Sequence, residues 1–139
     1  MKRIIGLDIG KVRIGVAISD PLGTFAQGIA VLDAGKDWIG LLRKTIEERN
    51  VGTLVIGLPV RTDGSLGPEA VWVDSVIKRL RAEFGELEIT SWDERFTTTS
   101  ATQSLLEGDV SRKGRKKVVD KVAATIMLQG YLDNRRRGT

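Results

Sequence analysis

The chain has 139 residues, and its 41% hydrophobic and 29% charged content is typical of a globular protein, so we expect one domain over residues 1–139. The absence of histidine and cysteine excludes an imidazole base, a thiolate nucleophile, a disulfide framework and a zinc site built on sulfur or imidazole ligands. No apolar run is long enough to cross a bilayer and no signal peptide is recognisable, so we expect a cytoplasmic protein without a membrane partner.

The net charge of +4 is unevenly distributed. Residues 111–139 contain nine Lys and Arg against two Asp, whereas the rest of the chain contains thirteen against sixteen acidic residues. A basic segment on a mildly acidic body predicts a polyanionic partner, and nucleic acid is favoured because no amphipathic helix with a bulky aromatic face points to lipid. A solvated tail is the alternative, and it suffices for the arginines at 135–137. The candidate nucleic-acid contacts in this segment are Arg112, Lys113, Arg115, Lys116 and Lys117.

The first predicted elements form a meander of three strands. Apolar runs separated by Gly10 and by a turn at 20–23 place these strands at Lys2 to Asp8, Val12 to Ser19 and about Phe25 to Leu32. Their short connections favour antiparallel pairing.

Helices and strands alternate in the remainder of the chain. Apolar residues at helical spacing predict a helix from about 38 to 46 and a second from about 68 to 84, with strands at 53–57 and 87–92. Two further helices are predicted, at 98–106 and from 115 to about 134. A meander followed by alternating strands and helices predicts an α/β fold with a mixed five-stranded sheet and flanking helices, the layout of ribonuclease H-like folds.

Asp8 is the first candidate for chemistry, because it lies at the end of the opening strand and no imidazole or thiolate is present. Carboxylates that hold Mg²⁺ or Mn²⁺ are the simplest remaining basis for catalysis. Strand alternation places Asp8 on the same face as Ile4 and Gly6, and Gly6 leaves room beside it. A turn-capping Asp is the alternative interpretation.

Asp93 and Glu94 end the last strand and point to opposite faces, so at most one of them faces Asp8. Periodicity does not choose between them, and the other carboxylate is free to pair with Arg95 or to cap the following helix.

Asp120 lies on the final helix at the border of its apolar stripe, with the small residues Ala123 and Ala124 one turn later. A carboxylate at the rim of a buried face destabilises the fold unless it is paired or bound to a metal. The competing explanation is a salt bridge to a neighbouring lysine, namely Lys116, Lys117 or Lys121.

Four ordered blocks together resemble the YqgF (RuvX) family. They are Asp8-Ile9-Gly10 with Arg13-Ile14-Gly15-Val16-Ala17, Gly57-Leu58-Pro59 with Asp63-Gly64-Ser65, Asp93-Glu94-Arg95-Phe96-Thr97-Thr98 with Ala101, and Asp120 with Ala123-Ala124 and Leu128-Gln129-Gly130-Tyr131-Leu132-Asp133. The first block alone is also similar to sugar kinases and chaperone ATPases, but those enzymes need a second lobe that 139 residues do not supply.

The resemblance implies a ribonuclease H-like nuclease that trims the 5′ end of pre-16S rRNA, and it implies that Asp8, Glu94 and Asp120 are the catalytic, metal-binding carboxylates. RNA is the favoured partner. The alternatives are a Holliday junction resolvase acting on DNA and a module that binds nucleic acid without cutting it.

One position departs from the family pattern. The family has Thr-Lys-Arg after the glycine, whereas this chain has Lys11-Val12-Arg13. In a strand this shift moves the lysine to the opposite face, so Arg13 and Arg95 are the expected phosphate contacts near the carboxylates.

Overall fold

The computed structural model describes residues 2–94 and 112–137, with side chains from 120 to 136 in the second part. The described elements, in chain order, are β1 (Arg3–Ile9), β2 (Arg13–Ser19), β3 (Ala26–Asp33), α1 (Trp38–Arg49), β4 (Val51–Leu58), α2 (Pro68–Glu83), β5 (Glu88–Asp93) and α4 (Arg112–Arg137).

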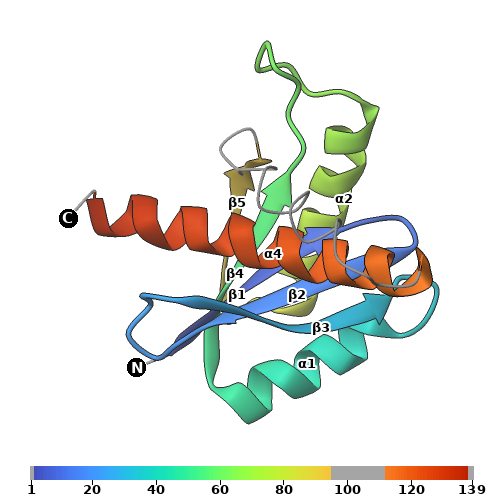
Figure 1. The fold of residues 1–139 in the computed structure, drawn as a ribbon. Coiled ribbons are helices and arrows are strands. Elements are labelled where there is room, and N and C mark those ends of the chain that lie inside the picture. The colour runs from blue at the N-terminus through green and yellow to red at the C-terminus, as the bar shows by residue number, and fades with distance from the viewer. Residues whose placement is uncertain (1, 95–111, 138–139) are drawn as a thin grey trace.

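The five strands form one mixed sheet in the order β3-β2-β1-β4-β5 (Figure 1). The hairpin-connected strands β1, β2 and β3 pair antiparallel, whereas β4 pairs parallel with both β1 and β5. Parallel neighbours require crossovers, and α1 and α2 supply them. The predicted mixed five-stranded α/β sheet is therefore confirmed.

The two faces of the sheet bury different side chains, as strand alternation requires. Ile5 and Leu7 of β1 are fully buried in a cluster with Leu42 of α1 and Ile77 of α2. Ile4 faces the other way, in a second cluster formed mainly with α4, which crosses the strands on that face (Figure 1). Even-numbered positions of β1, including Asp8, therefore face α4.

Helix α4 approaches the sheet closely because glycines occupy its path. A Cβ on Gly6 would lie 2.8 Å from the Cβ of Leu128, and a Cβ on Gly15 would collide with the main-chain oxygen of Asp120. Side chains larger than hydrogen at these positions would lift the helix, so the glycines determine the height of Asp120 above β1 and β2.

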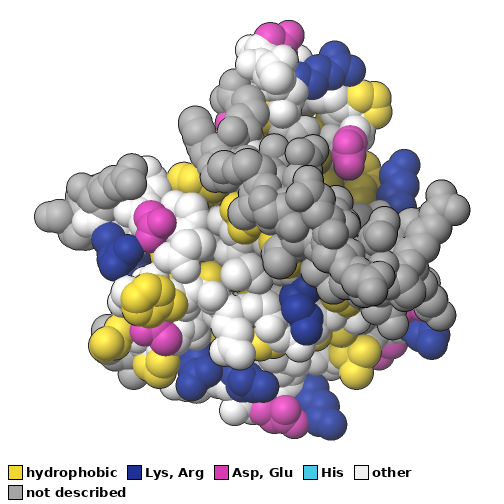
Figure 2. Space-filling model, in the orientation of Figure 1, with side chains coloured by type: hydrophobic (Ala, Val, Ile, Leu, Met, Phe, Trp, Pro, Cys, Tyr) yellow, Lys and Arg dark blue, Asp and Glu magenta, His cyan; other side chains and the backbone are white. Residues whose placement is uncertain are grey.

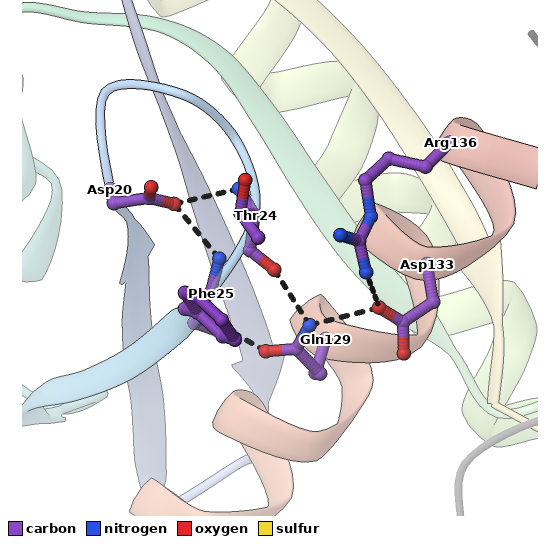
Figure 3. Close-up of polar contacts among 7 residues, drawn as sticks. Asp20, Thr24, Phe25, Gln129, Asp133 and Arg136 are labelled. Carbon is purple, nitrogen blue, oxygen red and sulfur yellow. Dashed lines mark hydrogen bonds and ion pairs between the residues drawn. The ribbon is translucent and has the colours of Figure 1, made fainter.

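Gln129 attaches the second half of α4 to the β2–β3 turn (Figure 3). Its Oε1 accepts a hydrogen bond from the backbone N–H of Ala26 at 2.8 Å, and its Nε2 donates to the carbonyl of Thr24 at 2.9 Å. The same Nε2 donates to Asp133, which also pairs with Arg136. One side chain thus satisfies two backbone groups that are more than a hundred positions away in the chain.

The structure corrects several predicted boundaries. Helix α4 begins at Arg112, three residues before the predicted start, and β2 begins at Arg13. Lys11 consequently lies in the turn between β1 and β2, where strand alternation does not apply, and the prediction that it points to the opposite strand face was wrong. The helix predicted at 98–106 lies outside the described residues. None of the described helices combines the length and apolar composition needed to cross a membrane.

Candidate functional site

Asp8 lies near the carboxyl end of β1, directly opposite Gly15 of β2 in the antiparallel ladder. Directly opposed residues of two strands project to the same face, so Asp8 shares its face with the position that α4 covers. The carboxyl ends of the parallel strands β1, β4 and β5 meet at the same edge of the sheet, which is where sites of open α/β sheets gather.

Glu94 follows β5 immediately and reaches across β4 to Asp8, with which it forms a side-chain hydrogen bond. Gly57 of β4 lies between them, and a Cβ there would collide with the Glu94 carboxyl group. Trp92 packs in the α4-side cluster, so alternation points Asp93 to the opposite face and returns Glu94 to the face of Asp8. The structure therefore brings Glu94, and not Asp93, to Asp8.

Burial and like charge perturb this pair. Desolvation and the neighbouring Asp8 raise the pKa of Glu94 from 4.5 to about 8, with smaller contributions from Glu69 and Asp93. Desolvation also raises the pKa of Asp8, and the charges of Asp120 and Glu69 act in the same direction, although the hydrogen bond from Glu94 opposes them. At neutral pH Glu94 therefore retains a proton, which it donates to the Asp8 carboxylate.

Asp120 pairs with an arginine from the sheet. The Nε of Arg13 donates to Asp120 Oδ2 at 2.7 Å, and both side chains are partly buried. The structure thus joins β2 and α4 through Oδ2 of Asp120. Of the three lysines proposed as alternatives, Lys121 is not paired with Asp120 among the described side chains, and the side chains of Lys116 and Lys117 lie outside them. Asp120 is close enough to raise the pKa of Asp8, so the three predicted carboxylates gather in one region.

The carboxylates of Asp8, Glu94 and Asp120 are not close enough together to enclose a metal ion. Within residues 2–94 and 120–136, no group of three or more acidic side chains is arranged closely enough to enclose a metal ion. Asp8 and Glu94 form the tight pair, and Asp120 stands beside them, held by Arg13.

Glu69 is a fourth carboxylate that the sequence reasoning missed. It lies in the first turn of α2 and its charge raises the pKa of both Asp8 and Glu94. The sequence feature that could have identified Glu69 is its position next to Pro68, at the start of the helix that follows Gly57-Leu58-Pro59.

The predicted cationic contacts are only partly described. The ammonium of Lys11 lies 5.7 Å from the ring centroid of Trp72, a cation–π contact at the turn after β1. Arg95 lies outside the described residues. Arg112, Lys113, Arg115, Lys116 and Lys117 occupy the first turns of α4, and their side chains are outside the described set. On the face shown in Figure 2, most of the described Lys and Arg side chains lie at the periphery, and one lies near the middle.

Residues 2–134 match the family RuvX, described as Holliday junction resolvase. The chain belongs to this family. It is 48% identical over 134 residues to a protein of Clostridium botulinum strain Hall named "Putative pre-16S rRNA nuclease", with 95% of this chain and 97% of that protein covered. A protein of the same name from strain Alaska E43 is 49% identical, with 94% and 96% covered.

Solved structures establish the fold of this family member independently. Thermus thermophilus RuvC in complex with a Holliday junction substrate superposes with a TM-score of 0.58 at 12% identity, covering 100% of this chain and 98% of that one. The fowlpox virus resolvase in complex with junction DNA gives a TM-score of 0.56 at 14% identity, with 95% and 97% covered. The ribonuclease H-like fold predicted from the order of elements is confirmed.

Proposed function

We propose that this protein is a divalent-metal-dependent nuclease, a single domain over residues 1–139, that hydrolyses phosphodiester bonds in structured nucleic acid. Its proposed role is the processing of the 5′ end of pre-16S rRNA in the cytoplasm. The observation that carries the proposal is the hydrogen-bonded pair of Asp8 and Glu94 at the carboxyl edge of the sheet, with Asp120 beside it. The name shared by the relatives supports RNA as the substrate.

The donor set fits Mg²⁺ or Mn²⁺. Asp8, Glu94 and Asp120 offer only carboxylate oxygens, the ligands that these hard cations prefer. The raised pKa of Glu94 indicates that the pair needs a positive partner, and at neutral pH a proton fills that need. Bound divalent cations would activate the attacking water and stabilise the leaving oxygen of the scissile phosphate.

The chain's own groups have separate proposed roles. With a cation bound, Glu94 would lose its proton to solvent and serve as a second anionic ligand beside Asp8, while Asp120 would extend the site from the helix. Arg13, Arg95 and the basic residues at 112–117 bind backbone phosphates, which orients the substrate without reading its sequence. Desolvation of Asp8 and Glu94 would strengthen their electrostatic contact with a bound cation.

Resolution of DNA four-way junctions is the second candidate, and one observation favours it. The family is described as Holliday junction resolvase, and two of the structures that share the fold hold junction DNA. The same carboxylates would serve either substrate, because phosphodiester hydrolysis is common to both.

The deciding experiment compares cleavage of a 5′-extended 16S rRNA fragment, duplex DNA and a four-way junction with Mg²⁺ or Mn²⁺ added. We expect cleavage of the RNA that Asp8→Asn abolishes, because the amide keeps the size of the carboxylate but loses the charge that holds a cation. Asp74→Asn is the matched control and should cleave normally, because Asp74 is a partly exposed residue of α2 that pairs with Lys78. Unchanged single-turnover cleavage by folded Asp8→Asn protein would contradict the proposal, and metal binding without turnover on any substrate would support a non-catalytic module.

A further inference from the structure

Three adjacent features place the backbone of Asp120. Asp8 and Gly15 are direct partners across β1 and β2, and the main-chain oxygen of Asp120 occupies the space that a Gly15 side chain would need. Arg13 lies two residues before Gly15 and therefore on the same strand face. At the start of β2, Gly15 thus leaves space for the backbone of α4, and Arg13 supplies a cation for the Asp120 side chain.

Backbone placement alone does not orient the Asp120 carboxylate. Asp8 and Asp120 carry like charges close enough for one to raise the pKa of the other, and Glu69 adds a further negative charge at Asp8. Repulsion therefore favours rotation of the Asp120 side chain away from the site. The Arg13 guanidinium opposes this rotation through a charge-assisted hydrogen bond of 2.7 Å between partly buried groups.

The geometry of this contact leaves ligand capacity on Asp120. Only Nε of Arg13 and Oδ2 of Asp120 are joined, and the paired side chains do not form the two-bond fork that arginine and carboxylate often make. Among the described residues, Oδ1 of Asp120 has no ion-pair partner. A carboxylate held by one oxygen retains the other for a cation.

We propose that Arg13 is a positioning residue that holds Asp120 in the orientation of a metal ligand, in addition to any phosphate contact. This inference rests on the proposed function, since it assigns Arg13 to the same carboxylate site. It resembles the general arrangement in which a hydrogen-bonding partner orients a ligating side chain, where loss of the partner typically weakens metal affinity about 10- to 100-fold.

The test measures Mn²⁺ affinity by titration calorimetry without nucleic acid, so that phosphate contacts play no part. Arg13→Gln should weaken Mn²⁺ binding by about tenfold or more. If Arg13 acted only as a positive charge, Arg13→Gln would instead strengthen Mn²⁺ binding, because its removal would relieve repulsion of the cation. The control is Arg43→Gln, which breaks an arginine–carboxylate pair with Glu83 between α1 and α2 and should bind Mn²⁺ normally.

A double-mutant cycle separates positioning from general destabilisation. In an Asp120→Asn background, Arg13→Gln should cause little further loss, because the residue through which it acts has already been changed. An equal loss in both backgrounds, or unchanged or tighter binding in the single variant, would overturn the inference.

Arg13→Lys keeps the charge, and it replaces Arg13→Gln if that variant does not fold. Its affinity should lie between those of wild type and Arg13→Gln because lysine lacks the planar Nε–H donor. Affinity equal to wild type would overturn the geometric role. Failure of wild-type protein to bind Mn²⁺ at all would instead count against the proposed function.

Discussion

Glu94→Gln should flatten the pH dependence of the stability of the metal-free protein. In the folded protein, desolvation and Asp8 raise the pKa of Glu94 to about 8, whereas in the unfolded chain it titrates near its ordinary 4.5. Below the lower value both states hold the proton, and the native protein keeps the full stabilisation of its neutral, hydrogen-bonded group. As the pH rises from 4.5 to about 8, only the native state retains the proton, so the free energy of unfolding falls.

The size of this fall follows from the gap between the two pKa values of Glu94. At about 1.4 kcal/mol for each pH unit, the interval from 4.5 to about 8 corresponds to a loss on the order of 5 kcal/mol as an upper bound. Glutamine cannot titrate but still donates a hydrogen bond to Asp8, so the variant should lose much less stability over the same range. Relative to wild type, it should therefore become more stable as the pH rises.

The assay is urea unfolding in EDTA, followed by tryptophan fluorescence, at several pH values from about 4 to about 9, which bracket the two pKa values of Glu94. Asp93→Asn is the control, because Asp93 points to the opposite face of β5 and contributes least among the causes of the Glu94 shift. This control should follow the wild-type profile. A decline in Glu94→Gln as steep as in wild type would refute the reasoning that Glu94 holds the proton.

Three other outcomes are expected. Mn²⁺ affinity of the wild type, measured by calorimetry, should rise about tenfold per pH unit until about pH 8, because the cation displaces the Glu94 proton; a flat profile would contradict this. Neutralising residues 115–117 to Gln should lower the log–log salt slope of RNA binding by about 2 to 3, measured by fluorescence anisotropy from low to moderate salt, and an unaltered slope would make the run a solvated face. Gln129→Ala should cost about 1 to 3 kcal/mol of unfolding free energy in urea, because it leaves two backbone groups of the β2–β3 turn without their partner; a smaller loss would indicate that water replaces it.

Local sequence patterns were sufficient to predict the helices and strands and to identify the candidate carboxylates. Apolar runs and helical spacing predicted the strands and described helices to within a few residues, because hydrophobic periodicity reflects which face of an element is buried. The short connections between the first strands predicted antiparallel pairs, and the longer helical connections predicted parallel pairs, since only a crossover joins parallel neighbours. Together they predicted the mixed sheet. Asp8 was recognisable as a strand-end carboxylate, and the ordered motifs of the family resemblance indicated Glu94 and Asp120.

Only the tertiary structure decided how these residues meet. Alternation alone left Asp93 and Glu94 equivalent, and the resemblance favoured Glu94. Only the structure supplied the physical reason, which is that Trp92 packs on the face that α4 covers. Reasoning along one helix offered only lysines to Asp120, whereas the structure pairs its Oδ2 with Arg13, 107 positions away. Periodicity specifies two faces of a strand but not which helix will cover each one. That assignment, and with it the Arg13–Asp120 ion pair and the effect of Asp120 on the pKa of Asp8, depends on packing α4 across the glycine positions of β1 and β2.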